Sequence, residues 1–180
     1  MARRLVLMTA LLLALPAPSA LGAAVPPPAA GEASLEGYFL LTGHVTSAVN
    51  VAGERVGQTL RRSWAFVPLC SIGVCSEVKL IRSGGRGGTL VLVRRAQMVY
   101  VGTGSFAAPV RCAGRRFPRG QTVPFSITVR IVAAAPAPTG IVATAIRATY
   151  TNPSRINHTP CVAIPGREAA TYEVRPPTLS

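Results

Sequence analysis

Residues 64–75 read W-A-F-V-P-L-C-S-I-G-V-C, and this stretch decides the fold class. Trp64 and Phe66 are two positions apart, so on a strand both rings point to the same face, where they can anchor a core. A proline ends the strand, and Gly73, between the two cysteines that follow, can adopt the positive φ that a tight return requires. The stretch therefore predicts a strand that runs into a turn closed by a Cys70–Cys75 disulfide.

The chain contains four cysteines, which allow three pairings. We expect Cys70–Cys75 and Cys112–Cys161, because the local pair is sterically easy and the remaining pair ties the middle of the chain to its end. There is no C-x-x-C motif, and the only histidines are His44 and His158. The sequence therefore predicts two disulfides and no metal site.

Strand patterns follow one another from residue 37 to residue 174. The clearest is 123–131, where apolar residues at odd positions alternate with polar or small ones. No helical periodicity of ordinary length interrupts these patterns, and Pro- or Gly-rich turns separate them. The expected strands are 37–46, 58–67, 77–82, 89–94, 97–103, 123–131, 141–150 and 170–174.

This succession predicts an all-β fold, a single antiparallel meander of about eight strands that closes as a small barrel. A β-sandwich is the alternative, since short strands and tight turns suit both architectures. The predicted core consists of large apolar and aromatic residues: Tyr38, Leu40, Leu60, Trp64, Phe66, Val78, Leu80, Leu90, Leu92, Tyr100, Phe125, Ile127, Val129, Ile146 and Tyr172.

The first 22 residues combine a basic start, an apolar run and small residues, which is the pattern of a signal peptide. A Pro/Ala-rich linker over 23–34, a β domain over 35–174 and a tail over 175–180 are expected to follow. No later segment is long and apolar enough to span a membrane as a helix. The predicted location is therefore secreted, either extracellular or in the cell envelope.

The chain is strongly basic, with a net charge of +13 that comes from eighteen arginines and one lysine against six glutamates. The densest basic stretch is 111–120, in which guanidinium groups could bind phosphate or carboxylate groups and an aromatic ring could stack on a ligand. We expect anionic cell-envelope polymers or acidic glycans as partners, and no specific nucleic-acid recognition. The alternative is a solvated hairpin whose charges only maintain solubility. The candidate ligand-binding residues are Arg111, Arg115, Arg116, Phe117 and Arg119.

Few residues could take part in catalysis, because only His44 and His158 could act as bases and no G-x-S-x-G motif occurs. Glu36, Glu54 and Glu77 could serve glycoside cleavage only if folding brought them together. Residues 102–107 match G-x-G-x-x-A, but no helix pattern or suitably spaced acid follows. The sequence therefore predicts no catalytic residues, no cofactor and a non-enzymatic binding or structural module. Two alternatives are a small-molecule site inside the barrel and a secreted hydrolase.

Two spacings also resemble a known group. W-x-F-x-P-x-C-x4-C at 64–75, followed by Y-x-G-T at 100–103, is similar to uncharacterised secreted β-rich domains of actinobacteria. The resemblance implies a secreted β domain with a structural disulfide. Because that group has no assigned activity, the resemblance implies no catalytic or binding residue.

Overall fold

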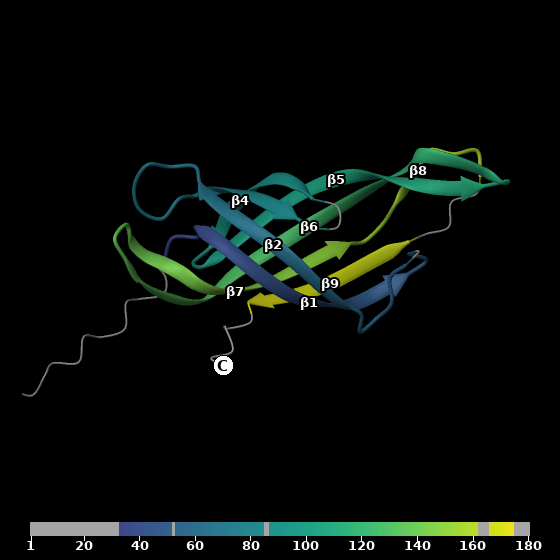
Figure 1. Ribbon diagram of the computed structural model, residues 1–180. Coiled ribbons are helices and arrows are strands. Elements are labelled where there is room, and N and C mark those ends of the chain that lie inside the picture. Colours follow the sequence, from purple (N-terminus) through teal and green to yellow (C-terminus); the bar gives the residue numbers. More distant parts are fainter. Residues whose placement is uncertain (1–32, 52, 85–86, 162–165, 175–180) are drawn as a thin grey trace, which may run out of the picture.

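The computed structural model describes residues 33–51, 53–84, 87–161 and 166–174 (Figure 1). Within these ranges all regular secondary structure is β-strand. The strands are β1 (Gly37–Val49), β2 (Thr59–Pro68), β3 (Glu77–Ser83), β4 (Gly88–Ala96), β5 (Val99–Cys112), β6 (Arg115–Ala137), β7 (Gly140–Asn152), β8 (Ile156–Asn157) and β9 (Arg167–Val174).

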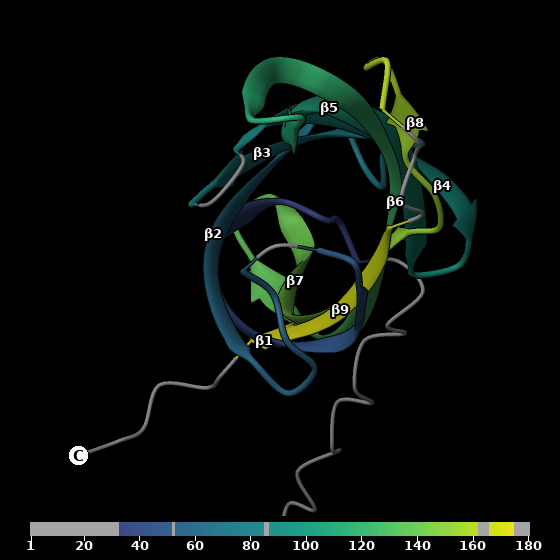
Figure 2. The ribbon, with the colours of Figure 1, turned by 90° about the vertical axis from the view of Figure 1, so that its right-hand side faces the viewer.

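All these strands belong to one antiparallel sheet. Strands β1 to β7 pair with their neighbours in sequence, β9 pairs with both β7 and β1, and the β5–β6 pairing completes a ring of eight strands. The two-residue β8 attaches to β6 outside this ring. Figure 2, a view along the ring axis, shows the strands surrounding a common interior. The predicted all-β antiparallel meander is confirmed, and its closure removes the free edges that a sandwich would keep.

Strands β5 and β6 are much longer than the sequence indicated. Their hairpin extends beyond the ring at the end that also carries β8 (Figure 1). The expected strands covered only 97–103 and 123–131, whereas β5 continues past Pro109, which lies at the register shift between Ala108 and Val110, where a proline is tolerated because a bulge interrupts the ladder. The connection between the expected strands 123–131 and 141–150 is accordingly shorter than their bounds indicated, because β6 continues to Ala137.

The predicted core residues on β1 are wrong by one position. Tyr38 and Leu40 are each 65% exposed, whereas Phe39 and Leu41 are buried. The phase of β1 is set by Gly43, because a Cβ at this position would clash with the ring of Tyr172. Gly43 faces the interior, and the pleat takes Phe39, Leu41 and Val45 inward with it, up to the register shift after Val45.

The remaining predicted core residues do face the interior. Leu60 and Leu90 are partly buried against the core. The buried members are Trp64, Phe66, Val78, Leu80, Leu92, Tyr100, Phe125, Ile127, Val129, Ile146 and Tyr172.

One end of the ring is closed by the chain that leads into β1. Ser34 forms a parallel bridge with Val142 of β7, and Ala33 and Leu35 are buried beside it. The folded part therefore already includes two residues that the sequence had assigned to the linker. The predicted signal peptide, the rest of the linker and the tail lie outside the described residues.

Both predicted disulfides are present. Cys70 and Cys75 join β2 to β3 with a Cα–Cα distance of 5.5 Å, and Cys112 and Cys161 join the β5–β6 hairpin to the chain after β8 with a distance of 6.1 Å. At the closed end, the Tyr100 hydroxyl donates a hydrogen bond to the Cys75 carbonyl oxygen at 3.1 Å. None of the described residues forms a helix that is long and apolar enough to cross a membrane.

Candidate functional site

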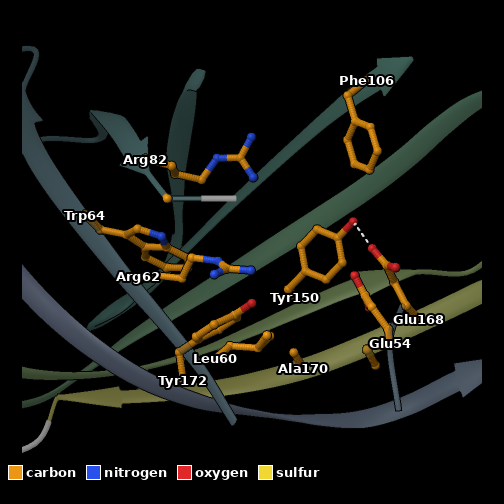
Figure 3. A pocket seen from close by; sticks show the side chains of 12 residues that line it. Glu54, Leu60, Arg62, Trp64, Arg82, Phe106, Tyr150, Glu168, Ala170 and Tyr172 are labelled. Carbon is orange, nitrogen blue, oxygen red and sulfur yellow. Dashed lines mark hydrogen bonds between the residues drawn. The ribbon is translucent and has the colours of Figure 1, made fainter. Parts of the chain in front are cut away.

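A cavity of about 230 Å³ lies inside the ring, toward the end opposite residues 33–36. We call it the interior cavity. The side chains of β2, β3, β5, β7 and β9 line it, together with Glu54 from the loop between β1 and β2 (Figure 3). Its wall combines charged, aromatic and apolar groups, in contrast to the apolar packing at the closed end.

Two arginines reach the interior cavity through simple strand alternation. Leu60, Arg62, Trp64 and Phe66 occupy alternate positions of β2, so they face the same side of the sheet. On the neighbouring strand, Arg82 is the register partner of Trp64. Figure 3 shows both guanidinium groups pointing from this wall toward Tyr150.

The guanidinium group of Arg82 is only partly satisfied. It lies over the Phe125 ring, with its central carbon 4.6 Å from the ring centroid, while its buried Nε has no hydrogen-bond partner. Burial lowers the pKa of Arg82, because removal from water disfavours the charged form, and the positive charge of Arg62 adds to this effect. Among the described residues, neither arginine forms a salt bridge with a carboxylate.

Aromatic rings form two groups around these arginines. Trp64 and Tyr172 lie 5.4 Å apart between ring centroids. Phe125 is stacked with Tyr150 at 5.6 Å and contacts Phe106 at 6.0 Å. Glycines make room for both groups: Gly43 lies under Tyr172, and a Cβ at Gly104 would come within 2.7 Å of the Phe125 ring.

A buried carboxylate faces the arginines across the interior cavity. Glu168 accepts a hydrogen bond from the Tyr150 hydroxyl at 2.7 Å and pairs with Arg155 at 3.2 Å, and both side chains of that ion pair are only 9% exposed. Burial raises the pKa of Tyr150, and its hydrogen bond to Glu168 and the negative charges of Glu168 and Glu54 raise it further. Glu168 is therefore paired with Arg155 rather than with either of the two cavity arginines.

The sequence-predicted arginine patch is found at the tip of the β5–β6 hairpin, but its members divide between two faces. Arg111 and Arg116 are direct register partners, so they share one face. Arg115 faces the other way and lies over the Phe117 ring at 5.6 Å. Arg119 is exposed further along β6. The hairpin therefore presents a pair of arginines on one face and an arginine on an aromatic ring on the other.

The residues considered for hydrolysis do not converge. The His44 ring lies 3.5 Å from the Thr59 hydroxyl, and the His158 ring lies 2.8 Å from the Thr122 hydroxyl. Glu36 accepts a hydrogen bond from Thr139 at the β6–β7 turn, whereas Glu54 lines the interior cavity at the other end of the ring. Within the described ranges no group of histidine, cysteine or acidic residues could hold a metal ion.

Sequence reasoning missed Arg62, Arg82 and Glu168 as site residues. The two arginines could have been found from a signal in the sequence, namely an arginine at an inward position of an otherwise apolar alternation. Arg62 interrupts the series from Leu60 to Phe66 and Arg82 ends the series from Val78. An inward-facing charge needs a partner of opposite charge, and neither strand contributes an inward-facing acidic residue.

Comparisons with known proteins do not identify the chain. A scan against protein-family models, a search of curated proteins and a search of solved structures each found no match. The resemblance to secreted actinobacterial domains therefore stays a prediction.

Proposed function

We propose that this chain is a secreted, non-enzymatic binding domain that holds a small organic anion in the interior cavity. The observation that carries the proposal is the pair of arginines, Arg62 and Arg82, which face this cavity without a carboxylate partner among the described residues. This corresponds to the small-molecule alternative rather than to the polymer site expected from the charge of the chain.

The energetics favour an anionic occupant. The two guanidinium groups are positive charges that face the same cavity, and no carboxylate among the described residues neutralises either of them. An anion in the interior cavity would accept hydrogen bonds from their terminal nitrogens and offset the repulsion between the two positive charges. Binding would thus be stabilised by charges that have no acidic partner among the described residues.

The size of the interior cavity limits the occupant to a small molecule. Its volume of about 230 Å³ is below the roughly 300–1,000 Å³ of pockets for drug-sized ligands. A polymer chain would not fit inside the ring. The two disulfides support an extracellular location, because such bonds persist in oxidising compartments.

Trp64 provides a direct test, because it is the only tryptophan of the chain and lies in the cavity wall. We expect small organic acids to change its fluorescence in a saturable way, and the corresponding neutral amides to have no effect. Arg62→Gln and Arg82→Gln should each weaken binding by at least about tenfold, since a charge-assisted hydrogen bond is worth about 1.5–3 kcal/mol. Arg147→Gln, on the outer surface, is the matched control. Equal binding of acids and amides, or unchanged affinity in both cavity variants, would contradict the proposal.

A second site has its own supporting observation. Arg111 and Arg116 are directly opposite each other on the exposed tip of the β5–β6 hairpin, an arrangement that costs stability unless an anion lies between them. We propose that this tip contacts anionic cell-envelope polymers or acidic glycans. Binding to such polymers should decrease with salt and in the double variant Arg111→Ser/Arg116→Ser, while the double variant Arg94→Ser/Arg95→Ser serves as a control of equal net charge. Loss of binding in the control as large as in the tip variant would leave only a general charge effect.

A further inference from the structure

The interior cavity contains enough detail to define the chemical class of its occupant. We infer that it binds a small aromatic monocarboxylate, with the carboxylate against the edge of Arg82 and the ring between the two aromatic groups. This inference rests on the proposed function and names the ligand class of the same site.

The carboxylate is placed by the two terminal nitrogens of Arg82. One face of the guanidinium is covered by the Phe125 ring at 4.6 Å, and the Nε atom is buried and so is not reached from the cavity. An anion must therefore approach in the plane of the guanidinium, along the edge formed by the two terminal nitrogens. Two parallel N–H···O bonds along that edge match the planar geometry of a carboxylate.

The charge of the occupant is limited by the acidic residues of the same cavity. Glu54 and Glu168 both line it, opposite the arginines. A doubly charged phosphate would be repelled by these carboxylates more strongly than a single negative charge. The balance of charges therefore favours a monocarboxylate.

The shape of the occupant follows from the aromatic rings. Trp64 and Tyr172 form one pair, and Phe106 and Tyr150 flank Phe125 in the other group. Figure 3 shows the open space between Trp64, Tyr150 and Tyr172, with the arginine side chains entering it. Rings prefer offset-stacked or edge-to-face contacts with other rings, which a flat aromatic body offers on both faces and a puckered aliphatic ring does not.

The test is a set of matched ligands followed by Trp64 fluorescence and calorimetry on the oxidised protein. Benzoate is the probe, cyclohexanecarboxylate keeps the charge but is not planar, phenylphosphonate keeps the ring but carries more charge, and benzamide removes the charge. We expect benzoate to bind at least about tenfold more tightly than each of the other three.

The geometry at Arg82 is tested by the conservative variants. Arg82→Lys keeps a positive charge but removes the planar donor edge, so it should weaken benzoate binding by about tenfold or more, whereas Arg147→Lys on the outer surface should not. Selective ¹⁵N spectra of arginine side chains give a second measurement that is independent of affinity. The resonances of the terminal NH₂ groups of Arg82 should shift and exchange more slowly with water when benzoate binds.

The outcomes distinguish the aromatic monocarboxylate from the more general anion site. Binding of all the anions with similar affinity and equal sensitivity to Arg82→Lys and Arg82→Gln would overturn the aromatic monocarboxylate and leave the anion site in place. Binding of none of them would overturn both. Unchanged resonances of the Arg82 terminal NH₂ groups in the benzoate complex would overturn the edge-on geometry.

Discussion

The two ends of the ring use the same eight strands for opposite purposes. At the closed end, the interior is filled by buried apolar side chains such as Leu35, Leu80, Ile131 and Ile146, and the Tyr100 hydroxyl has a partner. At the other end, the strands contribute arginines, a carboxylate and tyrosines around a cavity. The comparison indicates that the closed end supplies the stability that lets the other end keep poorly satisfied polar groups.

The largest effect should come from the closed end. Ile131 is fully buried at 0% exposure, so Ile131→Ala should lower the free energy of unfolding by about 2–5 kcal/mol, through lost burial and the cavity it leaves. Leu60→Ala, at the rim of the interior cavity, removes a side chain that is only partly buried and should cost less. Urea unfolding of both variants measures the difference. A larger loss of unfolding free energy for Leu60→Ala than for Ile131→Ala would show that the cavity end, and not the closed end, supplies most of the stability.

The closed end is also the part that could be predicted from the sequence. Residues such as Val78, Leu80, Ile127 and Val129 lie in unbroken alternations, and a period of two fixes which face is buried once any member is known to be inside. The phase of β1 could not be predicted in this way, because Tyr38 and Phe39 are equally suited to a core. It depends on the contact of Gly43 with Tyr172, a residue distant in sequence.

The interior cavity was harder to predict for a related physical reason. Arginine is usually exposed, so an arginine in a strand suggests the solvent face, whereas Arg62 and Arg82 are inside because a closed ring encloses both ends of each strand. The partners of Glu168 come from β7 and from the turn after it. No local sequence pattern predicts such contacts, because they form only when the ring closes.

The second prediction concerns the response of the cavity end to alkaline pH. Burial raises the pKa values of Tyr150 and Tyr172 in the folded state, whereas in the unfolded chain a tyrosine titrates near pH 10. The stability contributed by the protonated hydroxyls is complete below about pH 10, and it decreases as pH rises further, because the unfolded state releases protons that the folded state retains. Tyr150→Phe should reduce this slope by at most about 1.4 kcal/mol per pH unit.

Urea unfolding between pH 8 and pH 11 provides the measurement. Tyr38→Phe, which removes a hydroxyl from the outer surface, is the matched control and should keep the wild-type slope. A slope in Tyr150→Phe equal to that of the wild type would show that the hydrogen bond to Glu168 does not hold this proton. The buried hydrogen bond between Tyr150 and Glu168 would then no longer distinguish the cavity end from the closed end.

The smallest effects should come from exposed charges that lie outside the interior of the ring. Arg116 is opposite Arg111, whereas Glu173 is opposite Arg147 and pairs with it at 2.7 Å with both side chains about 60% exposed. Arg116→Thr should therefore raise the free energy of unfolding, and Glu173→Gln should lower it, each by about 0.2–1 kcal/mol at low salt.

Salt dependence separates these electrostatic effects from strand propensity. Thr favours strands more than Arg does, so part of the gain in Arg116→Thr could persist at any ionic strength. The electrostatic part should vanish in both variants near 1 M salt, where the screening length is about 3 Å, and Arg116→Lys should show no gain at low salt. If the effects survive high salt unchanged, the opposed arginines do not repel each other. The hairpin tip would then have no unfavourable charge for an anionic polymer to relieve.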